Sequence, residues 1–279
     1  MSDELEKQSS VSDDSQMSVA EHINELRRRL TRTVILLAVG FIVAFIFKDF
    51  LTGILFGPSN PEFLSNRAFA WLADQTGVDM LRINQSNPEL INTQMAGQFK
   101  LHLKLSFVAS LVVTIPFALW QLWLFVRPAL TQKVIRHCRS LVFEVSLWFF
   151  VGLLFGYFIV APLANNFLSN YVLSTEINNM IDVNSYLSIV LGVSMACALT
   201  FQLPLLIKLL ATIGIVSSKL LRKYRKIAFT VILILSAVIT PPDVFSQILV
   251  GAPLYILYEY GIVITRRIEH KRAARQQHN

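Results

Sequence analysis

The stretch that decides the fold reads Ile239-Thr240-Pro241-Pro242-Asp243-Val244-Phe245-Ser246-Gln247, and apolar runs flank it at residues 227–239 and 248–265. Two adjacent prolines do not fit inside a helix, because each lacks an N–H and the second disfavours the helical conformation of the first. We therefore predict a sharp turn between two membrane helices. Polar groups facing lipid are costly and tend to be functional. The alternative is a plain interhelical turn capped by Asp243.

The composition is that of a membrane protein. Of the 279 residues, 54% are hydrophobic and 15% are charged, whereas soluble domains are about one-quarter charged. The net charge of +7 would suit a nucleic-acid partner, but the basic residues lie at the edges of the apolar runs rather than on one soluble face. We therefore expect one integral membrane domain and no nucleic acid.

Six apolar runs predict an all-α integral membrane protein with six transmembrane helices. The runs cover residues 30–47, 99–126, 140–162, 186–216, 227–240 and 247–265. About 20 helical residues cross a bilayer core roughly 30 Å thick. The fifth and sixth spans are predicted to be short, and the fifth would reach only about 21 Å. We expect the bilayer to thin locally beside it.

The basic residues also predict the orientation. Lys and Arg gather before the first run, between the second and third, between the fourth and fifth, and after the sixth, whereas the loop at 165–185 has none. Both termini are therefore predicted to be cytoplasmic. We expect residues 1–17 to form a disordered cytoplasmic tail, residues 18–267 the six-span membrane domain, and residues 268–279 a basic cytoplasmic tail. In the long outer loop, residues 61–72 predict a short helix on the membrane surface.

No catalytic motif is visible in the sequence. It has no Walker-type loop, no His-Glu-x-x-His and no Gly-x-Ser-x-Gly. The five histidines are scattered, and Cys138 and Cys197 suggest neither a disulfide nor a metal site. We expect no catalytic residues, no metal and no cofactor, so recognition is the function class that remains.

The segment Glu21-His22-Ile23-Asn24-Glu25-Leu26-Arg27-Arg28-Arg29-Leu30 predicts an amphipathic helix along the cytoplasmic face, which then turns into the first span. Glu21 and Glu25 share one face of that helix because they are four residues apart. The alternative, favoured by spacing alone, is an ordinary solvated helix in which Glu25 pairs with Arg28 or Arg29.

Several polar residues fall inside the apolar runs, among them Glu144, Gln202, Lys208 and Glu259. Lys208 is expected to extend toward the cytoplasmic interface, and Glu144 to pair with the neighbouring basic loop. Gln202 precedes Pro204, so its carboxamide either satisfies backbone groups freed by the proline or faces a wet cavity. Glu259 is expected to face protein or water rather than lipid.

Taken together, these motifs resemble the TatC family of the twin-arginine protein translocase. The resemblance covers nearly all of residues 17–267 and rests on four stretches: His22-Ile23-Asn24-Glu25-Leu26-Arg27, Phe125-Val126-Arg127-Pro128-Ala129-Leu130, Phe201-Gln202-Leu203-Pro204 and Thr240–Gln247. It implies a multi-pass protein of the bacterial cytoplasmic (inner) membrane. Such a protein is a non-enzymatic receptor, and it exports folded proteins with twin-arginine signal peptides, driven by the proton gradient.

The resemblance also implies sites and partners. The signal-peptide site would comprise His22, Glu25, Leu26, Arg27, Phe125, Pro128 and Leu130. Single-span TatA- and TatB-type subunits would dock at the outer turn, formed by Thr240, Pro241, Pro242, Asp243 and Gln247. The intramembrane polar residues would be Gln202 and Glu259. Self-association within a larger complex is expected.

Two positions depart from the family pattern, because Val134 and Gln202 stand where the family usually has Glu. A missing carboxylate removes a partner of one guanidinium, and such a charged hydrogen bond is worth roughly 1.5–3 kcal/mol. We hypothesise that Glu21 or Glu144 compensates for Val134, and that Glu259 takes any proton-linked role that Gln202 cannot fill.

Two other functions compete with the receptor. A secondary transporter of a small molecule or ion would show paired charges near the bilayer midplane and often an internal repeat. A lipid-modifying enzyme would need clustered His or Asp at one interface. Neither pattern is visible in the sequence.

Overall fold

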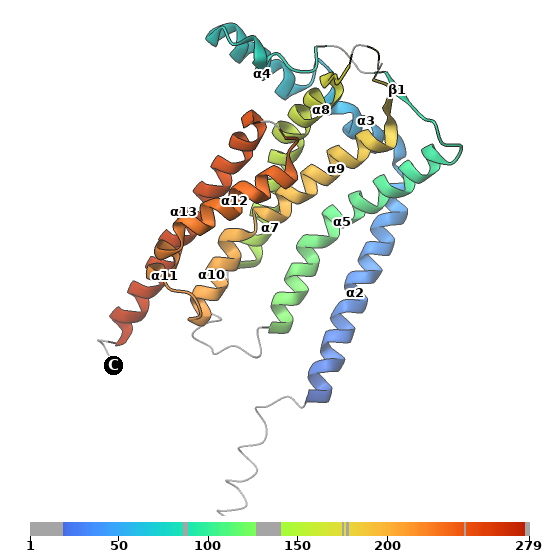
Figure 1. The fold of residues 1–279 in the computed structure, drawn as a ribbon. Coiled ribbons are helices and arrows are strands. Elements are labelled where there is room, and N and C mark those ends of the chain that lie inside the picture. The colour runs from blue at the N-terminus through green and yellow to red at the C-terminus, as the bar shows by residue number, and fades with distance from the viewer. Residues whose placement is uncertain are drawn as a thin grey trace, which may run out of the picture.

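The computed structural model describes residues 19–85, 89–126, 141–174, 176, 179–242 and 244–276. Long helices run side by side from one end of the molecule to the other (Figure 1). In chain order the helices are α2 Val19–Ile46, α3 Lys48–Phe56, α4 Leu64–Thr76, α5 Gly97–Val126, α7 Leu141–Phe155, α8 Ala161–Asn170, α9 Val183–Thr200, α10 Leu203–Ile213, α11 Ser218–Lys223, α12 Arg225–Ile239 and α13 Val244–Gln276.

Shorter elements connect them. These are the 3-10 turns η1 Gly57–Ser59 and η2 Asp79–Leu81, the π-helix η4 Gly156–Val160, and the strands β1 Leu90–Ile91 and β2 Ile181–Asp182. The two strands pair in parallel and have two residues each. The predicted all-α fold is therefore confirmed for the described residues, apart from this small pairing.

Five segments of the described chain are long and apolar enough to cross a membrane. They are Glu21–Ile46, Gly97–Phe125, Phe143–Asn170, Val183–Ile213 and Ser246–Lys271. The predicted fifth span corresponds to α12, which has only 15 residues. Its predicted shortness is confirmed, and the count of six spans stays a prediction.

The prediction of a short sixth span is wrong. Helix α13 has 33 residues and continues past Thr265 to Gln276, because the basic segment that follows is rich in Arg, Lys, Glu, Ala and Gln, which are good helix formers. The extension also contacts the bundle, since Glu269 Oε1 accepts a hydrogen bond from Ser218 N at 2.8 Å. Residues 268–276 are therefore part of α13, whereas 277–279 and the predicted tail 1–17 lie outside the described residues.

The turn that was predicted between the amphipathic segment and the first span is absent. Helix α2 is instead continuous over 28 residues. The segment contains no Gly or Pro before Gly40. Thr31 and Thr33 donate their hydroxyls to the carbonyls of Arg27 and Arg29 four residues earlier, so these threonines fit within a helix instead of ending it.

Prolines shape the third and fourth spans. Pro162, at the start of α8, directly follows the π-helix η4, and Pro204 lies at the start of α10 after a two-residue break at residues 201–202. Each proline lacks the N–H that would continue the ladder. Pro116 and Pro253 instead lie inside α5 and α13.

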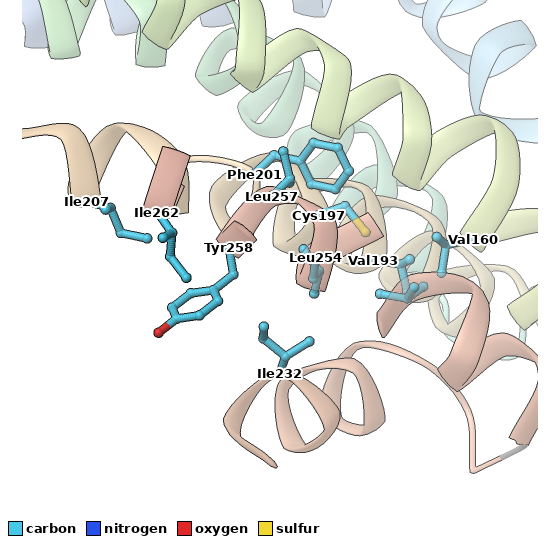
Figure 2. Close-up of a cluster of buried hydrophobic side chains, with 11 residues drawn as sticks. Val160, Val193, Cys197, Phe201, Ile207, Ile232, Leu254, Leu257, Tyr258 and Ile262 are labelled. Carbon is cyan, nitrogen blue, oxygen red and sulfur yellow. The ribbon is translucent and has the colours of Figure 1, made fainter. Parts of the chain in front are cut away.

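The largest core cluster joins η4, α9, α10, α12 and α13 (Figure 2). Its buried members are Val160, Val193, Cys197, Phe201, Ile207, Ile232, Val250, Leu254, Leu257, Tyr258 and Ile262. Because helices from both sides of the proline turn at 241–242 contribute, this core fixes α12 and α13 against the fourth span. Helix α2 packs mainly along α5, where Ser110 Oγ donates to Leu37 O at 2.6 Å.

Candidate functional site

The first candidate site lies where the start of α2 meets the end of α5. Glu25 Oε1 accepts hydrogen bonds from Arg29, from Nε at 3.0 Å and also from Nη2. Arg29 Nη1 donates to Gln121 Oε1 at 3.3 Å. Within the part of the chain that the structure describes, Glu25 Oε2 is buried and has no hydrogen-bond partner. The site thus holds the Glu25–Arg29 ion pair, in which one carboxylate oxygen, Oε2, accepts no hydrogen bond.

Aromatic stacking closes this site on one side. The His22 ring stacks on Phe125, with 4.2 Å between the centroids. The structure therefore brings together three residues that the resemblance assigned to one site, His22, Glu25 and Phe125. The spacing-based alternative is also met, since Glu25 pairs with Arg29.

Other predicted members of the site are not part of this cluster. Leu26 and Arg27 are exposed on the outward face of α2. Pro128, Leu130 and Val134 lie outside the described residues. Sequence reasoning missed Gln121, which is buried and joins α5 to Arg29. The signal available was a lone carboxamide in an otherwise apolar run.

The second polar group is an ion pair between the third and fourth spans. Lys208 Nζ lies 2.7 Å from Glu144 Oε1 and 2.5 Å from Oε2. The two residues were expected to act separately, with Lys208 extending to the interface and Glu144 pairing with the basic loop. In the structure they pair with each other, because α7 and α10 pack side by side and pairing lowers the cost of each charge.

Gln202 satisfies backbone groups, which was one of its two predicted roles. Its Nε2 donates to Val145 O and Ala198 O, both at 3.4 Å. Ala198 O lies just before the break in the fourth span, where the regular ladder stops. The Gln202 side chain therefore links α7 to the end of α9 by hydrogen bonds.

Glu259 faces protein, as predicted. Its Oε2 lies 2.6 Å from Arg225 Nη2, and Tyr255 donates its hydroxyl to Oε1 at 3.2 Å. The pair joins the first residue of α12 to α13, and both side chains are partly exposed. This ion pair holds α12 and α13 together at the end of their hairpin that lies opposite the proline turn.

The outer turn forms a third candidate site. Thr240 is buried and donates to Ser236 O at 2.8 Å, and Gln247 Nε2 donates across the hairpin to Leu233 O at 3.2 Å. Pro241 is buried and Pro242 exposed. Asp243 lies outside the described residues, so its predicted capping role stays a prediction.

A groove of about 370 Å³ adjoins this turn. Its walls come from α8, α9 and the end of α12, with Thr240 and Pro241 at one side. At Gly192, on the α9 wall, an added Cβ would meet no atom within 4 Å. The groove is thus open at mid-helix, and its lining is largely apolar. Among the described residues, no three His, Cys, Asp or Glu side chains come together to hold a metal.

Comparison with known proteins gives a consistent picture. The family model described as Sec-independent protein translocase protein (TatC) matches residues 21–253. The chain is 33% identical to TatC of Blattabacterium over 92% of this chain and 98% of that protein. It is 32% identical to TatC of Escherichia coli K12 over 88% of this chain and 86% of that protein.

Solved structures agree. The crystal structure titled Twin Arginine Translocase Receptor- TatC superposes with a TM-score of 0.65 at 28% identity, over 89% of this chain and 100% of that one. A second crystal structure of that receptor, in DDM, gives a TM-score of 0.67 over 88% of this chain.

Proposed function

Because the chain belongs to the TatC family of Sec-independent protein translocase proteins, we propose that it is the subunit that receives twin-arginine signal peptides at the site between α2 and α5. Family membership makes it a multi-pass protein of the bacterial cytoplasmic membrane and a translocase component. The cargo would be folded proteins, both termini would be cytoplasmic, and the proton gradient would supply the energy without catalysis by this chain.

The spare oxygen of Glu25 is the observation that carries this proposal. A buried acceptor without a donor costs free energy, and an arriving guanidinium would remove that cost by donating to Oε2. Arginine suits the site better than lysine, because its planar fork presents several donors in fixed directions. Arg29 engages Oε1 and leaves Oε2 without a donor.

The second arginine of the signal needs another acceptor, since Val134 replaces the family's usual Glu. Of the two candidates, Glu21 is exposed and lies one turn before Glu25 on the same helix, whereas Glu144 lies on α7. We therefore favour Glu21 as the compensating acid.

Single-span TatA- and TatB-type subunits would dock at the outer turn. The groove beside Thr240 and Pro241 supports this, because it is open at Gly192 and lies among helices that expose apolar faces. Small residues let helices approach closely in lipid. Any proton-linked step would fall to Glu259 rather than Gln202, since a carboxamide does not titrate.

A secondary transporter is less well supported. Among the described residues, two ion pairs join different long helices, Lys208–Glu144 and Arg225–Glu259, but Glu144 lies in the first turn of α7 and Arg225 begins α12. Both pairs are therefore near helix ends rather than at the midplane, where coupling charges of a transporter would be expected.

The test is binding of a twin-arginine signal peptide, compared with its Lys-Lys form, to membranes holding the wild type or Glu25→Gln. We expect the wild type to prefer Arg-Arg and the variant to lose about ten- to a hundredfold in affinity, the value of one charged hydrogen bond. Glu21→Gln should weaken binding too. Asn24→Ala, on the exposed side of the same turn, is the matched control. Unchanged preference in Glu25→Gln would overturn the assignment.

A further inference from the structure

Helix α4 buries two polar side chains and exposes several of its large apolar ones. Its inward face buries Ser65, Asn66 and Ala73. Asn66 Nδ2 donates to Asn60 O at 2.7 Å and to Pro58 O at 3.1 Å, so the buried carboxamide is satisfied. A helix of this size in water would normally turn its polar side chains outward.

The outward side of α4 carries an apolar stripe together with exposed polar residues, which include Arg67, Asp74 and Gln75. Leu64 is 71% exposed, Trp71 62% and Leu72 40%, and Ala68 is exposed between them. At 3.6 residues per turn these four positions form one stripe. Arg67 is exposed at the edge of this stripe. Exposure of this apolar stripe is favourable where the stripe meets an apolar phase.

The depth of α4 in the molecule identifies that phase. The helix lies at the end of the bundle remote from the C-terminus and projects to one side (Figure 1). Phe63, which caps its start, stacks on Phe158 of η4 with 5.2 Å between the centroids and packs edge-on against Tyr157. Because η4 belongs to the membrane-spanning segment Phe143–Asn170, the start of α4 is packed on a span.

Helix geometry gives an approximate position. Phe158 follows Phe143 by 15 residues, which is about 22 Å along a helix. The hydrocarbon core is about 30 Å thick, so Phe63 would lie roughly 8 Å inside its outer edge when the inner edge of the core is placed at Phe143. That is the depth at which interfacial helices bury their apolar faces, roughly 5–10 Å.

From these observations we propose that α4 is an interfacial helix that inserts its stripe of Leu64, Ala68, Trp71 and Leu72 into the outer leaflet of the lipid bilayer. Phe150 and Leu154 of the third span are also exposed, eight and four residues before Phe158. Trp71 suits this place because tryptophan favours the headgroup region. Arg67 lies at the rim, where it can pair with lipid phosphates.

The test uses the full-length purified chain in phospholipid nanodiscs, with no signal peptide and no partner subunit. Cys138 and Cys197 are replaced by Ala, and a single Cys for a fluorescent label is placed by Leu64→Cys, Trp71→Cys or Glu89→Cys. Glu89 is an exposed acid at the same end of the molecule and serves as the matched control. Each label is exposed to iodide in the water and, separately, to lipids carrying a nitroxide near the headgroup.

We expect labels at 64 and 71 to be quenched by the lipid nitroxide and to have a several-fold smaller iodide quenching constant than the label at 89. Quenching by iodide alone would place the stripe in water and overturn the proposal. Protection from both quenchers would mean that protein covers it, and would overturn the proposal as well. The labelled positions are exposed, so we expect the variants to fold normally. Unchanged elution from a sizing column is the check for misfolding. The result does not depend on signal-peptide binding.

Discussion

Lys208 and Glu144 show what a charged side chain requires inside a membrane span. The two lie on different helices, 64 residues apart in sequence, and meet at hydrogen-bond distance. Each charge alone would be costly in a poorly solvated site, and removal of one partner leaves the other uncompensated. Gln202 follows the same principle with neutral groups, since its amide donates to two backbone carbonyls.

The ion pair predicts a non-additive response to substitution. We expect Lys208→Met to destabilise the protein by roughly 1.5–3 kcal/mol, because Glu144 loses its charged partner. The double variant with Glu144→Leu should recover most of that loss, since the two apolar side chains replace the pair. Thermal unfolding in detergent measures both.

Lys104→Met is the matched control for this pair. Lys104 is an exposed lysine of α5 whose Nζ lies 2.7 Å from the neutral hydroxyl of Ser188, so its removal leaves no charge behind. Equal losses in Lys104→Met and Lys208→Met would show that the pair with Glu144 has no special weight.

At the scale of elements, glycines set the distance between the third and fourth spans. At Gly152 of α7 an added Cβ would lie 2.7 Å from Cys197 O and 2.9 Å from Ala198 Cα. At Gly156 it would lie 2.7 Å from Ser194 Cα. These neighbours belong to the backbone of α9 and cannot rotate away. In membrane proteins, small residues let two helix backbones approach closely, and the close approach increases the dispersion contacts between the helices.

Gly152→Ala should therefore push α7 from α9. We expect a loss of about 1–3 kcal/mol, the usual cost of overpacking, measured as a lower unfolding midpoint. Gly192→Ala is the matched control on the same helix pair, because a Cβ there meets nothing within 4 Å. That variant should be neutral or gain up to about 1 kcal/mol from helix propensity. A loss at Gly192 equal to that at Gly152 would contradict the packing argument.

At the scale of the whole molecule, the spans differ in length on opposite sides. Helix α2 has 28 residues, whereas α12 has 15 and reaches about 22 Å. The exposed side chains of α12 include Phe229, Val231, Ile234 and Val238. The hydrocarbon core of a bilayer, about 30 Å thick, is longer than this apolar face of α12. Lipids adapt to such a mismatch by thinning locally.

We accordingly expect the lipid belt to be thinner beside α12 than beside α2. Density of the bilayer around the chain in nanodiscs, imaged by electron cryomicroscopy, measures both sides in one particle, so α2 is the internal control. Uniform thickness around the circumference would contradict the prediction.

The sharp turn at the adjacent prolines was predicted from the sequence, and the lengths of the outer helices were not. Adjacent prolines at 241–242 and single prolines at 162 and 204 act through the backbone of their own segment, and the structure places a turn or an altered helix beside each. The turn predicted between residues 21–30 and the first span is absent, and the continuation of α13 beyond its apolar run was missed. Hydropathy indicates where an apolar segment ends and not where a helix ends. Helix propensity and contacts such as Glu269 with Ser218 decide the latter.

The sequence by itself determined the membrane class, the approximate spans, the short fifth helix and the family, because lipid forces each apolar segment to satisfy its own backbone in a helix. Only the tertiary structure decided which polar side chains of different helices meet: Arg29 with Gln121, Lys208 with Glu144, and Glu259 with Arg225. It also decided that α4 turns its apolar stripe outward. The physical reason is that such contacts depend on the rotation and depth of one helix relative to another, and these follow from packing across the whole bundle rather than from any local pattern.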